Sequence, residues 1–494
     1  MNQYHEHPLR ILKYSAKNIW LLIFPLIRGL MHFPFRINRE WLYEWLSGAW
    51  FDILIIVLII IFGLVRWYSS LLLIDSASVT HLDGVIIRVR KTIPYSSISS
   101  TSFEHPFYLR PFHAVTVKCD TSAGLFRTSD MKLLVSSKVS RELSEKFPGI
   151  KPSDGAEEFP EPSVLSLILF SAFFSSGATG IIYLATFFYK GGDIARDMIG
   201  RYIDKVTENT ERFTGKLLMR LPDAAVGVGA LFIGAWLLSF LVNLVKYARF
   251  SLFYNKTHLR LSYGAITRKS YSITASHINY IDFRQNLIMK VLRMAATHIS
   301  CAGYGNSRKS LPVLIPVRRL KSMGPEFEKL GAGRGSKIEY KPKIPALWNY
   351  IWLPVIVTFS LVPAYLIVAR LIPALNRLTV FVAIMAEIPA VWMILVKFAA
   401  FFTSGIAVYD DRIKLSYSRF TIFHTVIAER RKLVKIEYEQ TLIQKLKGRC
   451  SMIFWFEGEV SRRHKIKAIP VKDVITVSEM LGTDVRQKVS SKRT

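Results

Sequence analysis

The chain has 494 residues, of which 51% are hydrophobic and 21% charged, and its formal net charge is +30. A single soluble domain is less apolar than this, and a protein lying wholly in lipid carries fewer charges. The composition excludes both classes and predicts a mosaic of membrane helices and soluble modules.

Apolar segments of about 17 residues or more, long enough to cross the hydrocarbon core as helices, recur along the chain. The first is interrupted by Pro25, Arg28 and Pro34. It lacks the small-residue cleavage site of a signal peptide, so we count it as a span. The six predicted spans cover residues 19–35, 51–65, 164–189, 224–245, 348–371 and 379–402.

After each pair of spans the sequence changes to the period-two alternation of short strands, followed by an amphipathic helix. The closing helices are expected to begin near Asp130, Val317 and Val471. The predicted domains are an N-terminal arm with hairpin one (1–67), module one (68–161), hairpin two with a long amphipathic outer loop (162–246), module two (247–343), hairpin three (344–403) and module three (404–494).

Two motifs recur in the modules. In module two, Leu259-Arg260-Leu261-Ser262-Tyr263-Gly264 follows a polar turn, and Gln285-Asn286-Leu287-Ile288 leads to a basic residue. Counterparts of the second motif stand at 105–110 and 440–449.

This order resembles the bacterial pleckstrin-homology (PH) membrane family of the YdbT-like type. The resemblance implies a membrane α plus β fold: six transmembrane helices in three hairpins, each followed by a cytosolic PH-like barrel or sheet with a C-terminal capping helix. It brings no catalytic site and no cofactor.

Charge is distributed unevenly among the modules. Module one has 11 Lys/Arg and 11 Asp/Glu, module two has 18 and 4, and module three has 19 and 10. A base near anionic headgroups gains roughly 1 kcal/mol within a Debye length. The candidate residues for binding anionic lipid or a protein partner are Lys256, Arg260, Arg268, Lys269, Arg318, Arg319, Lys321, Arg430, Arg431, Lys432, Lys435, Arg462, Arg463, Lys465 and Lys467. The alternative is that these are solvated strand faces that follow the positive-inside bias.

Six spans would place both termini and all three modules on one side of the membrane, and their positive charge favours the cytoplasm. Seven Lys/Arg in the predicted outer loop, 190–222, count against this orientation. The three cysteines all fall in the modules and fit a reducing compartment.

Motifs for other chemistry are incomplete. The segment 331–337 lacks the Gly-Lys-Ser/Thr ending of a phosphate loop. His5-Glu6-His7 is expected in a flexible N-terminal arm, and the other histidines lack metal-ligand spacing. Aromatic stacking platforms for nucleic acid are missing too. We therefore expect no catalytic residue, metal, cofactor or nucleic-acid partner.

Glu387, just before Pro389, is the deepest ionisable residue in a predicted span. Such groups mark polar paths or buried partners. The sequence thus favours a non-enzymatic plasma-membrane scaffold, or an envelope-protective, membrane-organising factor, which binds anionic lipid or a membrane or cytosolic protein. The alternative function is a lipid or peptide transporter with a polar route near Glu387.

Overall fold

The computed structural model describes residues 2–17, 39–121, 129–149, 157–175, 223–255, 257–301, 313–320, 337–373, 376–409, 411–457 and 463–482. The strands are β1 (Asn2–His5), β2 (Leu71–Ile74), β3 (Ser78–Asp83), β4 (Val89–Pro94), β5 (Ile98–His105), β6 (Ala114–Thr121), β7 (Met131–Ser136), β8 (Glu157–Phe159), β9 (Ser251–Tyr254), β10 (His258–Tyr263), β11 (Arg268–Thr274), β12 (Ile278–Gln285), β13 (Met294–Cys301), β14 (Val313–Arg319), β15 (Gly405–Tyr409), β16 (Arg412–Arg419), β17 (Ile422–Glu429), β18 (Leu433–Glu439), β19 (Arg449–Phe456) and β20 (His464–Pro470). The α-helices are α1 (Arg10–Lys17), α3 (Arg39–Tyr68), α4 (Ser137–Lys146), α5 (Val164–Phe174), α7 (Asp223–Tyr247), α8 (Leu287–Val291), α10 (Trp348–Leu371), α11 (Asn376–Thr403), α12 (Leu442–Leu446) and α13 (Val471–Met480).

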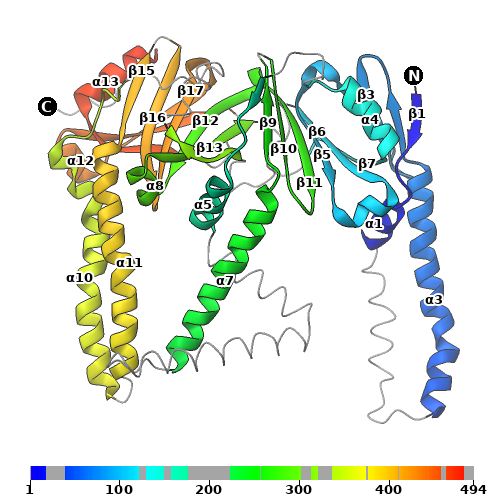
Figure 1. The fold of residues 1–494 in the computed structure, drawn as a ribbon, viewed down its shortest axis with the longest axis horizontal. Helices are drawn as coiled ribbons and strands as arrows, with labels where there is room; N and C mark the ends of the chain where they lie inside the picture. The colour runs from blue at the N-terminus through cyan, green and yellow to red at the C-terminus, as the bar shows by residue number, and fades with distance from the viewer. Residues whose placement is uncertain are drawn as a thin grey trace.

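The strands form a threefold repeat, for which we call β2–β7, β9–β14 and β15–β20 the first, second and third repeats. Each repeat contains three consecutive antiparallel strands, a short 3-10 turn and three more antiparallel strands. Figure 1 shows the sheets standing in a row, with α3, α7, α10 and α11 extending from one side of it.

The sheets do not coincide with the repeats. The sheet orders are β1-β2-β3-β4, β7-β6-β5-β11-β10-β9-β8, β14-β13-β12-β17-β16-β15 and β18-β19-β20. The second half of one repeat therefore continues into the first half of the next, through the pairs β5·β11 and β12·β17. Strand pairing between neighbouring repeats therefore carries the sheets across the module boundaries, whereas each of the three large hydrophobic cores comes almost entirely from one repeat, as expected of PH-like modules.

A buried ion cluster lies at the joint between the second and third repeats. Asp282 of β12 is 1% exposed. Its Oδ2 lies 2.7 Å from Nε of Arg284 and 3.0 Å from Nδ1 of His424, which is on β17. Burial alone would raise the pKa of Asp282, but the charges of His424 and Arg284 outweigh it and hold this pKa below its ordinary value.

The prediction of six spans is wrong. Among the described residues, two helices are long and apolar enough to cross a membrane, Ile344–Leu371 and Val382–Thr403. The other apolar helical stretches are shorter: Ile53–Tyr68, Val164–Phe174 and Leu231–Tyr247. The third of the six expected spans, 164–189, begins as α5. That helix ends at Phe174, and its C-cap is Ser175.

Two further expectations for this region cannot be compared with the structure. The first predicted span, 19–35, and the amphipathic outer loop of hairpin two lie outside the described residues.

Two of the expected closing helices do not begin where the sequence predicts. Met131–Ser136 forms β7, so the first closing helix starts at Ser137 rather than near Asp130. Val317 lies within β14. Short apolar runs fit a buried strand as well as a helix, and the two are hard to separate by pattern. The third helix, α13, begins at Val471 as predicted.

The Asp282 cluster yields a stability prediction. Replacing Asp282 with alanine leaves the Arg284 guanidinium buried without its partner carboxylate and removes the hydrogen-bond partner of the His424 ring, which costs about 3–5 kcal/mol for such a buried pair. The midpoint of thermal unfolding should fall. Because the folded-state pKa of Asp282 is depressed, its contribution is present at neutral pH and is lost as the pH falls, so the difference from wild type should shrink in acid.

The matched control is Arg431→Ala, which removes an exposed partner of Glu429 and should leave the midpoint unchanged. Equal midpoints for Asp282→Ala and wild type at neutral pH would contradict a stabilising role for the cluster.

Candidate membrane-contacting surface

The first feature of this surface is a row of apolar hairpin tips. The tips lie between β3 and β4, between β10 and β11, and between β16 and β17. Their apolar side chains point to solvent: Ile86 is 90% exposed, Ile266 53% and Phe420 74%. Gly264 has φ +108°, and a Cβ there would lie 2.1 Å from the carbonyl oxygen of Thr267, so this turn requires glycine.

The second feature is a short helix after β5, β12 and β18. These are the 3-10 helix η3 (Phe107–Phe112), α8 and α12. Asn286 and Thr441 cap α8 and α12 through hydrogen bonds to the backbone N–H groups of Met289 and Gln444. The large apolar side chains exposed on the three elements are Phe107, Tyr108, Phe112, Ile288, Val291, Leu292, Leu442, Ile443 and Leu446.

The same backbone conformation ends all three short helices. His113, Arg293 and Gly448 follow η3, α8 and α12 with φ of 53°, 54° and 60°. Left-handed backbone is unusual for residues other than glycine. Its recurrence at the same place shows that the three helices are equivalent parts of the repeat.

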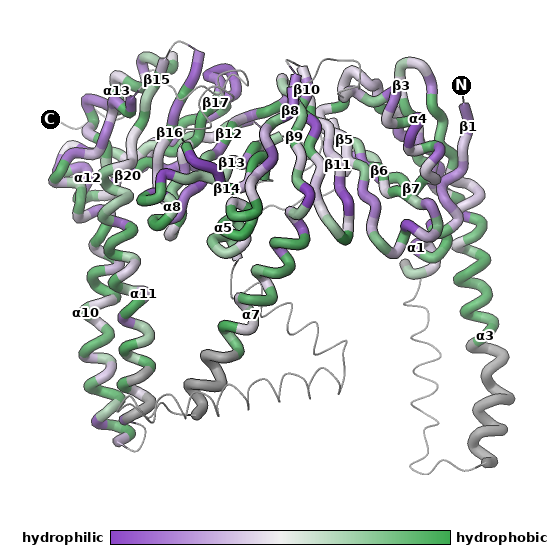
Figure 2. Tube along the Cα trace, viewed as in Figure 1, coloured by the Kyte–Doolittle hydropathy of each residue, from purple (hydrophilic) through white to green (hydrophobic). Residues whose placement is uncertain are grey.

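The tips and short helices lie where the apolar helices meet the sheets (Figures 1 and 2). Lys397 Nζ of α11 donates a hydrogen bond to the carbonyl of Phe420 over 2.7 Å. Arg449, just after α12, donates to the carbonyl of Pro345, three residues before α10, also over 2.7 Å. The backbone N–H of Ala265 reaches the carbonyl of Val245 in α7. Both features therefore lie at the helix-bearing end of the repeats.

The two candidate spans are fixed firmly to the third repeat. Their buried contact consists of Ala346, Tyr350, Val396, Ala400 and Phe401, packed against Phe423 and Ala468. The Tyr350 hydroxyl also donates to the carbonyl of Lys467 over 3.1 Å. The orientation of the helix pair thus determines which end of the sheets approaches a bilayer.

Basic side chains stand among the exposed apolar ones. Arg110 of η3 donates to the carbonyls of Ala265 and Ile266 in the next hairpin tip. Lys290 of α8 lies 4.1 Å from the ring centre of Phe423, beside the third tip. Burial lowers the pKa of Lys290 to about 8. The first two short helices, η3 and α8, therefore contact the following repeat through a base as well as presenting apolar groups.

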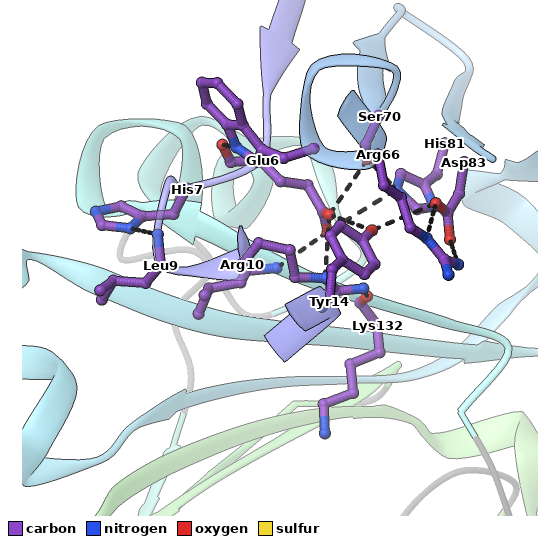
Figure 3. Close-up of polar contacts among 12 residues, drawn as sticks. Glu6, His7, Leu9, Arg10, Tyr14, Arg66, Ser70, His81, Asp83 and Lys132 are labelled. Carbon is purple, nitrogen blue, oxygen red and sulfur yellow. Dashed lines mark hydrogen bonds and ion pairs between the residues drawn. The ribbon is translucent and has the colours of Figure 1, made fainter. Parts of the chain in front are cut away.

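A polar cluster attaches the N-terminal arm to the first repeat (Figure 3). The Glu6 carboxylate is 1% exposed. It forms an ion pair with Arg10 at 3.1 Å and accepts hydrogen bonds from the Tyr14 and Ser70 hydroxyls. The arm itself forms β1, paired with β2, and α1. The expectation that His5-Glu6-His7 lies in a flexible arm is therefore wrong.

The same cluster connects α3 to the first hairpin. Arg66, near the end of α3, donates to both carboxylate oxygens of Asp83 at 3.3 and 3.1 Å. Burial opposes ionisation of Asp83, but the hydrogen bond and charge of Arg66 prevail and lower its pKa. Because every polar group of this cluster serves a structural contact, we interpret it as an anchor for the arm. Among the described residues, no group of three His, Cys, Asp or Glu side chains is arranged to hold a metal.

The predicted basic residues lie at three different distances from the apolar helices. Four lie at the helix-bearing end: Arg268, Arg318, Arg319 and Lys467. Four lie at the opposite end, because β17 carries the chain about 23 Å away from Phe420: Arg430, Arg431, Lys432 and Arg463. Four lie between, within strands: Arg260, Lys269, Lys435 and Lys465. Lys256, Lys321 and Arg462 lie outside the described residues.

Several of these bases already have acidic partners. Lys269 lies 3.3 Å from Glu104, and the pairs Lys432–Glu457 and Lys435–Glu437 are 2.7 and 2.6 Å long. Lys465 pairs with Glu439. These four bases are therefore engaged in ion pairs within the chain, and the Lys269 pair joins the first and second repeats.

Glu387 lies in α11 and is partly buried. Among the described residues, it forms no ion pair or hydrogen bond with another side chain.

Sequence reasoning noticed the short helices as repeated motifs but did not select them as sites. The signal was available: apolar residues alternate with Lys or Arg at 287–293 and 442–449. What the sequence could not show is that these apolar side chains point away from the core.

The resemblance to the bacterial PH membrane family that the sequence suggested is confirmed by comparison with known proteins. The family model described as "Bacterial PH domain" matches residues 23–146 and 213–324. The chain is also 24% identical over 267 residues to the UPF0699 transmembrane protein YdbT of Bacillus subtilis (strain 168). That alignment covers 51% of this chain and 50% of the relative, so the chain spans about half the length of the protein it matches. No solved structure matches.

Environment-sensitive labels can test whether the short helices contact lipid. Leu446 is 89% exposed and precedes Arg449, which contacts Pro345 just before α10. A polarity-sensitive fluorophore on Leu446→Cys should therefore shift to the blue when the full chain is placed in lipid nanodiscs. The native cysteines Cys119, Cys301 and Cys450 are buried and should not react. A label on Arg431→Cys, at the opposite end of the sheet, is the control. The same aqueous emission from both labels would exclude the proposed contact.

Proposed function

We propose that the protein is a non-enzymatic, membrane-anchored scaffold whose three repeats lie as one platform on the anionic cytosolic face of a bacterial plasma membrane. In this position it would organise the membrane or protect the envelope. The observation that carries the proposal is the apolar tip and short helix present at the helix-bearing end of every repeat.

Physical chemistry supports lipid as the contacting phase. Exposed Leu, Ile and Phe side chains cost little when they enter the interfacial region of a bilayer, and neighbouring bases gain from anionic headgroups. At the end of α12, Lys445 and Lys447 stand beside Ile443 and Leu446. In water, these apolar groups would form an exposed hydrophobic patch on every repeat, and such patches promote aggregation.

The shared sheets support a scaffold rather than three independent lipid sensors. Repeats joined by β5·β11 and β12·β17 cannot turn separately without breaking strand pairs. Lipid contacts at several tips would then all contribute to the membrane affinity of one molecule, as in multivalent binding.

Lipid retention by the intact protein tests the proposal. We would reconstitute the full chain in nanodiscs of phosphatidylethanolamine and phosphatidylglycerol and measure the enrichment of the anionic lipid around it. Lys445→Gln with Lys447→Gln removes two bases beside α12, each worth roughly 1 kcal/mol near the surface. Enrichment should fall, and the fall should be larger at low ionic strength.

The matched control is Arg430→Gln with Arg431→Gln, which removes the same charge at the far end of the third repeat. Enrichment should then match wild type. An equal loss in both double variants would mean that net charge alone attracts the lipid and would overturn the proposal.

A further inference from the structure

Two strands, β4 and β18, end the series of shared sheets. At the internal joints, β11 and β17, which are the third strands of the second and third repeats, pair with β5 and β12 of the preceding repeats. In the described residues, the equivalent strand of the first repeat, β4, ends its sheet, and so does β18, the equivalent of β5 and β12. The chain therefore carries one half of the same joint at each end.

The two internal joints have the same register. Ser100 pairs with Ile273 and Glu104 with Lys269 at the first joint. Tyr280 pairs with Ala428 and Arg284 with His424 at the second. The short 3-10 turns between the third and fourth strands lie at 95–97, 275–277 and 430–432. At both joints the residue three positions after one turn pairs with the residue two positions before the next turn. Applied to β18 and β4, the same count places Lys435 opposite Ile93 and Glu437 opposite Lys91.

Charges at this expected register are complementary. Both internal joints contain an acid on the earlier repeat and a base on the later one, the pairs Glu104–Lys269 and Asp282–His424. β18 carries Glu437 and Glu439, whereas β4 carries Arg90 and Lys91. Opposite charges facing each other across strands favour pairing by roughly 0.2–1 kcal/mol each.

Apolar groups on both strands also face solvent. Val434 of β18 is 69% exposed and Val89 of β4 is 46% exposed. At the internal joints a base of the short helix contacts the neighbouring hairpin tip, as Arg110 and Lys290 do. Lys445 occupies the equivalent place on α12. The tip it would meet contains Ile86 and Ile87, the most exposed of the three tips.

We propose that β18 of one copy of this chain pairs antiparallel with β4 of a second copy, continuing the series of shared sheets between molecules. The occupant is a second copy because one chain supplies both complementary edges. The sheets that carry them lie at opposite ends of the row (Figure 1). Such a head-to-tail contact closes into a ring or continues as an open chain of molecules. All tips would then face the same membrane surface.

Cysteine crosslinking tests the register in the full chain. Directly opposed residues of an antiparallel pair have Cα atoms about 4.5–5.5 Å apart, within the disulfide range of about 4.4–6.8 Å. Lys91→Cys and Glu437→Cys variants, separately purified and mixed in one membrane, should form a dimer on oxidation with oxidised glutathione. The double variant should form a ladder of higher oligomers. Arg90→Cys with Glu437→Cys is the matched control, because neighbouring residues of a strand point to opposite faces.

A charge-reversal cycle supplies an independent measurement. Lys91→Glu or Glu437→Lys alone should lower the oligomer mass measured by mass photometry in nanodiscs or detergent, and the two changes together should restore it. A monomer at every concentration, crosslinking as efficient in the Arg90 control, or capture of a different protein by Glu437→Cys in native membranes would each overturn the proposal. The lipid measurement above is made on a single chain, so loss of oligomers would leave its outcome unchanged.

Discussion

Backbone pairing between consecutive repeats is the interaction on which the rest of the structure depends. A strand at the edge of a small sheet exposes N–H and C=O groups that must be satisfied or protected. Here the third strand of one repeat satisfies the fourth strand of the preceding one, at β5·β11 and β12·β17. The repeats therefore keep a fixed order and height, which brings every hairpin tip and short helix to the same end.

Side chains then make each joint specific. At the first joint, burial disfavours ionisation of Glu104, but the Lys118 hydrogen bond and the Lys269 charge outweigh it and lower the pKa of Glu104. At the second, Asp282 is held by Arg284 and His424. Removing one member of such a buried group leaves the others without compensation. The two joints have the same register but different residues. Backbone pairing therefore sets the geometry of each joint, and side chains determine which strands pair.

Sequence patterns predicted the repeated strands because alternation at 258–263 and 412–417 has a direct physical meaning. They also placed the apolar hairpin 344–403, whose two helices are long enough to span. They failed where a local pattern has two solutions. Leu133 and Leu134 fit an amphipathic helix as well as the buried strand β7, and the run 164–189 does not reveal that α5 ends at Phe174. Pairing between repeats could not be predicted, because β12 alternates in the same way whichever strand it joins.

The candidate surface was missed for a related reason. Charge is visible in the sequence, so sequence patterns point to Lys and Arg clusters such as 430–432. Exposure is not visible: Leu442 and Leu446 resemble core residues in sequence but are 82% and 89% exposed. The structure thus points to exposed apolar groups beside a few bases rather than to the basic strand faces.

The distance between the first and third repeats tests most directly whether they form one body. Spin labels on Lys138→Cys in α4 and Lys472→Cys in α13 occupy exposed positions on opposite repeats. Pulsed electron paramagnetic resonance on the full chain in nanodiscs should give one narrow distance distribution, unchanged by lipid charge. A broad distribution, or one that shifts with lipid composition, would show that the repeats move independently and would contradict the shared platform.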